Sequence, residues 1–431
     1  MDRTFLQSRK NITAGYSHEG RTARRTSAVK PHARDVVITG LGVISPYGRG
    51  CDTLWAGLAA GACVLGPLRL FPTEGFPSNI GGQVPEATVR SLGAAQRSRA
   101  NRFLLAAGEE AVGQAGLPDS ALTTAAVSIG GTGGGMLEVE TWYQHYYQKQ
   151  NDRRVRGALR TMVPAAQTEA LARQFHIEGP RESPILACSS SAAALVTVAD
   201  LITTGMVDVG LAGGVDSLTR ICFMGFNTLK LVDKSPCRPF ARDRRGMSVS
   251  EGAAVLVLES YEHALARGAQ IRAFLSGGAI SSDAFHPIAP PPDAEGAVRA
   301  MREALQRAHL TPSDIGYVNA HGTGTVQNDK AESAALEHVF GAGKVVISGT
   351  KSLIGHTMGA AGAVEAATTI LALEAGLLPP TANLSEPDPE IPFDCIPYTA
   401  RPAVVDHAMS NSFGFGGQNV SVIFSHPRTL E

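Results

Sequence analysis

Short apolar runs alternate with helix-like stretches along most of the chain. The first run, Val36–Gly40, is rich in β-branched residues and closes with Gly-Leu-Gly, which predicts a buried strand entering a tight turn. A related arrangement returns at Ile271–Leu275, where the run leads into a glycine-rich bend at 276–281 after a helical stretch at about 261–268. We therefore expect two similar halves.

Further apolar runs of strand length lie between helical patterns within these halves. They are 127–130, 184–187, 207–212, 253–259, 315–320 and 345–348. This alternation favours a layered α/β architecture. The Pro-rich stretches Ala289–Pro292 and 379–393 cannot continue a helix or a central strand, so we expect surface connections there.

The first 34 residues differ from the rest of the chain. They hold eight Lys or Arg, only Asp2 and Glu19 as acids, and no apolar periodicity. We expect residues 1–34 to be a disordered basic leader; an organellar transit peptide would share this composition. We expect residues 35–270 to form the N-terminal half and residues 271–431 the C-terminal half.

Composition narrows the class of protein. With 431 residues and 44% apolar content, the chain can fold by packing alone, and its net charge of -1 gives no reason to expect nucleic acid or an anionic membrane as partner. Six cysteines without a C-x-x-C pair suggest neither a zinc site nor disulfides, which favours a reducing cytoplasm. We find no apolar run of the roughly 18 to 20 residues that a membrane span needs.

The sharpest chemical signal is Cys188, in Ala187-Cys188-Ser189-Ser190-Ser191 between an apolar run and a small, apolar helix-like stretch. A cysteine at the amino end of a helix meets the positive end of the helix dipole, which stabilises the thiolate. Cys188 is therefore a candidate nucleophile. A lone cysteine is more often a small buried residue, so this interpretation depends on the segments that follow.

Three later segments add to this signal. His321 follows an apolar strand in Asn-Ala-His-Gly-Thr-Gly-Thr, and His356 lies in Lys351-Ser-Leu-Ile-Gly-His356, although either could be an ordinary core histidine. Phe415 lies in Asn-Ser-Phe-Gly-Phe-Gly-Gly, where Gly414 and Gly416 free the backbone and the aromatic rings could close an apolar tunnel.

In this order, the four segments resemble the β-ketoacyl-[acyl-carrier-protein] synthases of the elongating, Cys-His-His type, over roughly residues 35–425. The KAS II-like enzymes and the type II polyketide ketosynthases look most similar. The resemblance implies a duplicated thiolase-like fold with five layers, α-β-α-β-α, and mixed sheets. It also implies a dimer, either a homodimer or a heterodimer with a ketosynthase-like partner.

The resemblance implies an acyltransferase, a 3-oxoacyl-[acyl-carrier-protein] synthase. Cys188 would accept the acyl chain, and His321 and His356 would assist decarboxylation of malonyl-carrier protein and stabilise the enolate that attacks the Cys188 thioester. Neutral imidazole donors suffice, because loss of carbon dioxide generates the carbanion. Lys351 and Glu332 match a charged pair that organises the histidines, with an ordinary salt bridge as the alternative.

Substrate contacts are implied in the same way. The backbone N–H groups of Cys188 and Phe415 would form an oxyanion hole, Phe415 would gate the pocket, and Thr323 and Thr325 would bind the pantetheine arm of the acyl carrier protein. The phosphopantetheine belongs to that substrate, so we expect no resident cofactor and no metal.

Three residues depart from the family pattern. Gln418 replaces a common Thr, Gly324 replaces a usual Ser, and Gly133 stands about where KAS II-like enzymes carry a branched pocket residue. The first two count against primary fatty acid synthesis, and Gly133 predicts a roomier acyl tunnel. Because carrier proteins are acidic, we expect a basic helix face near the tunnel, with Arg97, Arg99 and Arg102 as candidates and a plain solvated face as the alternative.

Three alternatives remain at this point. A non-catalytic chain-length partner subunit lacks the nucleophile, so Cys188, His321 and His356 argue against it. A thiolase or an initiating synthase typically differs at the position of His356. A specialised type II polyketide or polyene ketosynthase, acting with a partner subunit, stays compatible with the sequence.

Overall fold

The computed structural model describes residues 31–93, 98–148 and 157–430 of the chain. In this part, eleven strands form one hydrogen-bonded sheet in the order β12-β11-β15-β16-β10-β1-β9-β7-β5-β6, with β2 paired to β1 at the side. These strands are β1 (Val36–Ser45), β2 (Gly48–Arg49), β5 (Ala126–Gly130), β6 (Arg181–Glu182), β7 (Val209–Asp216), β9 (Gly252–Ser260), β10 (Ala273–Ser282), β11 (Ile315–Asn319), β12 (Val346–Ser348), β15 (His407–Gly414) and β16 (Gln418–Ser425).

The strand order contains an internal repeat. In the first group of strands, β9 pairs antiparallel with both β1 and β7, and β5 pairs parallel with both β7 and β6. In the second group, β16 pairs antiparallel with both β10 and β15, and β11 pairs parallel with both β15 and β12, which repeats the pattern. The two groups join where β1 pairs with β10, at Val37 with Phe274 and Ile38 with Ala273. The predicted duplication and the mixed strand directions are therefore confirmed; the exact boundary at 270/271 stays a prediction.

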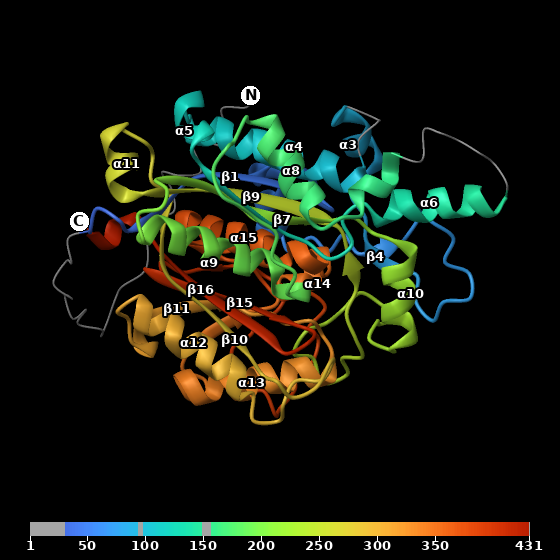
Figure 1. Cartoon of the computed structure of the whole chain (residues 1–431). Helices are drawn as coiled ribbons and strands as arrows, with labels where there is room; N and C mark the ends of the chain where they lie inside the picture. The colour runs from blue at the N-terminus through green and yellow to red at the C-terminus, as the bar shows by residue number, and fades with distance from the viewer. Residues whose placement is uncertain (1–30, 94–97, 149–156, 431) are drawn as a thin grey trace, which may run out of the picture.

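Helices complete five layers (Figure 1). Helices α4 (Arg99–Ala115) and α8 (Ala165–Gln174) cover the outer face of the first group of strands, and α12 (Glu295–Arg307) and α13 (Val326–Phe340) lie outside the second group. Helices α9 (Ser190–Thr203) and α15 (Ala361–Ala375) lie between the two groups, back to back. The predicted thiolase-like α-β-α-β-α fold is thus confirmed.

Smaller elements surround these layers. The remaining helices are α2 (Cys51–Ala59), α3 (Glu86–Ser91), α5 (Asp119–Thr123), α6 (Met136–Tyr147), α10 (Arg220–Thr228), α11 (Tyr261–Ala266) and α14 (Lys351–Ile354). Short strands β3 (Gly66–Pro67), β4 (Ile80–Gly82) and β8 (Val249–Ser250) form one ribbon, and β13 (Leu377–Leu378) and β14 (Arg401–Pro402) form another.

Two predicted turns are strand instead. The glycines after Ile38 do not end β1, and those after Leu275 do not end β10. A Cβ atom on Gly40 would lie 2.1 Å from the carbonyl oxygen of Ala111 in α4, and one on Gly277 would lie 2.2 Å from that of Ala304 in α12. These glycines therefore let a helix approach the strand closely, and they do so at equivalent places in the two halves.

Three other expectations need correction. Residues 184–187 form no strand; the strand of that segment is β6, and the chain then enters the 3-10 helix η3 (Ala187–Ser189). Residues 31–34, predicted as the end of the disordered leader, belong to the described part, where Arg34 forms an ion pair with Asp208; residues 1–30 lie outside it, and the leader there stays a prediction. The stretch Met358–Ala375 is long and apolar enough for a membrane span, but 89% of it is buried in the core.

Candidate active site

Cys188 lies at a sharp elbow between β6 and α9. Ala187 has a positive φ of 48°, and the hydroxyl of Ser190 accepts from the backbone N–H of Leu186 (2.9 Å) and donates to the carbonyl of Ala187 (2.6 Å). These bonds stabilise a strained turn that places Cys188 at the amino end of the buried helix α9. Cys188 is 7% exposed and lines a pocket.

The thiol of Cys188 is not the stabilised thiolate that the helix position predicts. Burial raises its pKa to about 12, and the buried carboxylate of Asp216 acts in the same direction. The charge of Lys351 and a hydrogen bond from the backbone N–H of Phe415 act against these effects without overcoming them. Burial dominates because the thiolate would lose its water, so the resting nucleophile is the neutral thiol.

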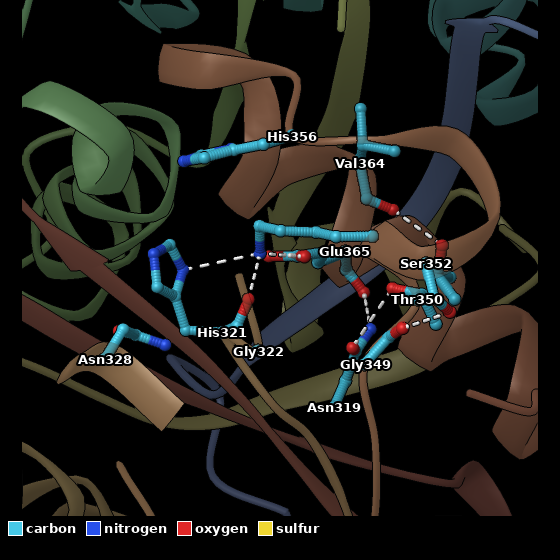
Figure 2. A network of polar contacts seen from close by, with 12 residues as sticks. Asn319, His321, Gly322, Asn328, Gly349, Thr350, Ser352, His356, Val364 and Glu365 are labelled. Atoms are coloured by element: carbon cyan, nitrogen blue, oxygen red, sulfur yellow. Dashed lines mark hydrogen bonds and ion pairs between the residues drawn. The ribbon is translucent and has the colours of Figure 1, made fainter. Parts of the chain in front are cut away.

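The two candidate histidines lie beside each other in the same pocket. Their ring centroids are 5.4 Å apart and their planes meet at 87°. Figure 2 shows both rings pointing to the same side of the polar network around Glu365 and Asn319. His321 comes from the loop after β11, and His356 comes from the loop after α14.

Hydrogen bonds indicate the same tautomer for both imidazoles. The backbone N–H of Met358 donates to Nδ1 of His356 (3.3 Å), and the ammonium group of Lys351 lies 3.3 Å from Nδ1 of His321. An Nδ1 atom that accepts leaves the ring proton on Nε2. Nε2 of His356 has no hydrogen-bond partner among the described residues, so its N–H is available to a ligand.

Both histidines are neutral. Burial lowers the pKa of His321 and of His356 well below the usual value, and the positive charge of Lys351 lowers both further. Protonation would place a second positive charge beside Lys351 away from water. The site therefore presents neutral N–H donors, as its proposed chemistry requires.

Lys351 is paired with a different carboxylate from the predicted one. Its ammonium group contacts Glu365 of α15 and donates to the carbonyl of His321 (2.6 Å), while the Lys351 and Glu365 side chains are 2% and 4% exposed. Glu332 instead accepts from the backbone N–H groups of His321 and Gly322, both at 2.8 Å. The predicted pair of Lys351 with Glu332 is wrong, although both groups support the loop that carries His321.

The structure brings most of the predicted residues together. The lining of the pocket includes Cys188, His321, Thr323, Thr325, His356, Gly414 and Phe415. Gly416 is exposed at the turn between β15 and β16, and its neighbour Gly417 lines the pocket instead. The hydroxyls of Thr323 and Thr325 are 2.9 Å apart; their pantetheine contacts, like the other individual roles, stay predictions.

Gly133 lies outside this lining, in the loop after β5. A Cβ atom there would be 3.5 Å from Oδ1 of Asp216 and 3.7 Å from both Sγ of Cys222 and Cγ2 of Thr219, which are ordinary contacts. The loop thus has room for one methyl group but no large void at this point. Whether Gly133 widens the acyl tunnel stays a prediction.

The departure at Gly324 has a local cause. Its φ is +83°, and a Cβ atom would lie 2.8 Å from the carbonyl oxygen of Gly246, whose N–H donates to the carbonyl of Gly324 (3.0 Å). Any side chain would be strained here. Gly324 therefore reflects the backbone of this loop and is no argument about the substrate. Gln418, the other departure, bonds locally to the carbonyl of Gly416 (3.3 Å).

Among the described residues, Arg99 and Arg102 do not form the predicted exposed basic helix face. Arg99 is 6% exposed and binds Glu251 (2.6 Å) and Glu86 (2.8 Å), so it is a core residue. Arg102 is half-buried against the carbonyl of Val89, and Arg97 lies outside the described residues. Sequence periodicity could not show that Arg99 forms a buried ion pair with Glu251, because Glu251 lies far away in the chain.

A buried thiol facing two neutral imidazole donors defines an enzyme that transfers acyl groups between thioesters, on a thiolase-like fold. Two family models match the chain: "Beta-ketoacyl synthase, N-terminal domain" over residues 33–264 and "Beta-ketoacyl synthase, C-terminal domain" over residues 272–385. The chain belongs to the β-ketoacyl synthase family.

Individual relatives agree with this assignment. The chain is 38% identical over 419 residues to 3-oxoacyl-[acyl-carrier-protein] synthase 2 of Rhizobium meliloti (strain 1021), covering 90% of this chain and 98% of the relative. It is 36% identical over 403 residues to nodulation protein E of Rhizobium sp. (strain N33), covering 91% and 99%. Among solved structures, the ishigamide ketosynthase/chain length factor superposes with a TM-score of 0.86 at 36% identity, covering 92% and 100%.

Proposed function

We propose that the protein elongates an acyl chain by two carbons through decarboxylative condensation with malonyl-[acyl-carrier-protein]. The observation that carries this proposal is the pocket that Cys188, His321 and His356 line together. Both imidazoles are neutral there, and no described residue accepts a hydrogen bond from the Nε2–H of His356, so this group can bind a ligand. Such donors stabilise an enolate oxygen without needing a strong base.

The proposed reaction has two halves. In the first, the Cys188 sulfur attacks the acyl thioester of the carrier protein; the new thioester forms, and the carrier thiol leaves with the proton of Cys188. In the second, the bond from the malonyl group to its carboxylate breaks, carbon dioxide leaves, and the enolate oxygen accepts from His321 and His356. The enolate carbon then attacks the Cys188 thioester, and the cysteine sulfur leaves and regains a proton.

No resident cofactor takes part in this scheme, because decarboxylation supplies the carbanion. The backbone N–H of Phe415 lowers the pKa of the Cys188 thiol. In the proposed scheme this same N–H binds the developing oxyanion of the acyl thioester. The Phe415 ring, 5.9 Å from that of Phe226 in α10, would have to move aside for a long acyl chain.

We propose that the acidic carrier protein binds a basic surface other than the predicted arginine face of α4. Lys230, Lys234 and Arg245 are exposed, and they neighbour the pocket residues Leu231 and Met247 in sequence. Charge reversal of Lys230 and Arg245 should raise KM for malonyl-carrier protein and leave the reaction with malonyl-pantetheine unchanged, since the latter has no acidic protein surface. An equal change for both substrates would exclude this surface.

A specialised polyketide or polyene ketosynthase acting in the cytoplasm with a partner subunit is the second candidate. It is favoured by the likeness to a ketosynthase solved with a chain length factor. The catalytic residues argue against a non-catalytic partner subunit.

One assay tests the function and separates these candidates. Purified protein, with Cys188→Ala as the blank, is loaded with saturated, short or polyene acyl-carrier proteins, given malonyl-carrier protein, and analysed by intact mass. Extension of saturated C8 to C16 chains by the lone protein supports fatty acid elongation. Extension only of short or unsaturated starters, or only with a partner, supports the second candidate; no Cys188-dependent acylation refutes both.

A further inference from the structure

A buried carboxylate outside the predicted site connects two segments that flank the pocket. Asp216 is the last residue of β7 and is 0% exposed. Its Oδ1 accepts from the backbone N–H groups of Thr132 (3.1 Å), Gly133 (2.6 Å) and Gly134 (3.1 Å). Its Oδ2 accepts from Thr132 (3.0 Å) and from Gly359 (2.6 Å).

The shell of Asp216 is made for an ionised carboxylate. All four backbone groups that it contacts are donors, so a protonated carboxyl group would have nothing among them to donate to. Burial raises the pKa of Asp216, whereas these N–H groups lower it. A buried charge is costly unless such donors satisfy it, which argues for a specific task at this position.

The contact with Gly359 leads directly to a catalytic group. Gly359 lies in the 3-10 helix η5 (Met358–Ala360), whose first residue has a positive φ of 53°. The N–H of Met358 is the donor that leaves the proton of His356 on Nε2. The backbone of His356 itself is held separately: its N–H donates to the carbonyl of Ser248, just before β8, and its carbonyl accepts from the N–H of Ser250 in β8 (both 2.8 Å). The bond from Gly359 to Asp216 thus bears on η5, whose Met358 N–H meets the imidazole, while other bonds hold the backbone of His356.

We propose that Asp216 is a positioning residue: it ties the loop 132–134 to η5 and thereby directs the Nε2–H of His356 into the pocket. The proposal deepens the function proposed above and rests on it. Asp216 touches neither substrate nor thiol in this scheme; it acts through the N–H of Gly359 and then that of Met358.

Asp216→Asn separates the two contacts. With the amide oxygen at the Oδ1 position, the three bonds from the loop 132–134 to that oxygen are kept, including the one from Thr132. The NH₂ group faces the N–H groups of Gly359 (2.6 Å) and Thr132 (3.0 Å), donor against donor, and only Gly359 loses its single bond to this side chain. The link to η5 is lost selectively. Asp208→Asn is the matched control, because Asp208 precedes the same strand but is exposed.

Two half-reactions provide the readout. Decarboxylation of malonyl-carrier protein, which uses the histidines, should fall by about ten- to a hundred-fold in Asp216→Asn, since a misplacement of about 1 Å has this effect. Acylation of Cys188, followed by intact mass, should not fall, because removing the Asp216 charge takes away one of the effects that raise the pKa of the thiol. Asp216→Glu, which keeps the charge and both acceptors, should recover part of the lost rate. Equal losses in both half-reactions, or no loss in decarboxylation, would overturn the proposal.

A second measurement needs no substrate and no change at Asp216. Nitrogen-15 NMR of histidine-labelled wild-type protein should show His356 neutral and protonated on Nε2, with His356→Asn used to assign its signals. The opposite tautomer would refute the proposed role of Asp216. If the wild type shows the expected tautomer but condenses no acyl chain, the proposed function fails and the positioning role does not.

Discussion

Replacing Glu365 by Gln removes one half of the buried ion pair while keeping the shape of the side chain. The ammonium group of Lys351 then lacks its anionic partner in a place where both side chains are nearly inaccessible to water. Breaking a buried pair in this way costs about 3 to 5 kcal/mol. With an unfolding entropy of about 2.1 cal/mol/K per residue, 431 residues give about 0.9 kcal/mol/K, so Tm should fall by about 3 to 6 °C.

Scanning calorimetry of four proteins checks this magnitude. The exposed pair of Lys330 and Glu390, with side chains 71% and 69% exposed, gives the matched control, and Glu390→Gln should shift Tm by less than about 1 °C. The double variant Lys351→Met/Glu365→Leu removes both charges and should be more stable than Glu365→Gln alone, although it should not decarboxylate malonyl-carrier protein. If Glu365→Gln melts within 1 °C of wild type, the burial cost assigned to this pair is wrong.

Three further outcomes follow from the site. Because the pKa of Cys188 is about 12, its alkylation by iodoacetamide should accelerate about tenfold per pH unit between pH 7 and 9.5; a plateau near pH 8 would mean a stabilised thiolate. Because the pKa values of His321 and His356 lie well below 6.5, malonyl decarboxylation should stay constant from pH 8 down to pH 6, where an ordinary histidine would be about three-quarters protonated; a steep loss there would show protonation. Gly133→Ile should shorten the longest acyl chain accepted in a competition assay, with Gly133→Ala close to wild type, and an unchanged preference would remove Gly133 from the tunnel wall.

The parts of the site that follow from local sequence were predictable. Cys188, His321, His356 and Phe415 each lie in a short segment whose residue types already specify an elbow or a glycine-rich loop, and all four meet in the pocket. The alternation of apolar runs and helical patterns likewise predicted the layers.

Features that depend on contacts between distant segments were not predictable. Glu332 and Glu365 are both acids near the histidine segments, and only the fold shows that α15 places Glu365 beside Lys351. The sequence offered one hint: Glu365 is the single acid in the largely apolar stretch 361–373, as expected for a buried acid that pairs with a cation. The thiol state of Cys188 depends on burial by the C-terminal half, which a helix-dipole argument does not include.

The middle layer has a consequence for how this architecture can be divided. Helix α9, which carries the nucleophile, and helix α15, which follows His356, belong to different halves, yet Leu195 and Ile370 share one core cluster. Gly362 of α15 packs so closely on Ala192 that a Cβ atom there would be 2.6 Å from the Ala192 Cβ. Each half therefore needs the middle-layer helix of the other half to cover the apolar face of its own. Expressed as separate polypeptides, the halves should each be insoluble or molten and should complement each other only when produced together, so the duplicated unit cannot persist as a free-standing module.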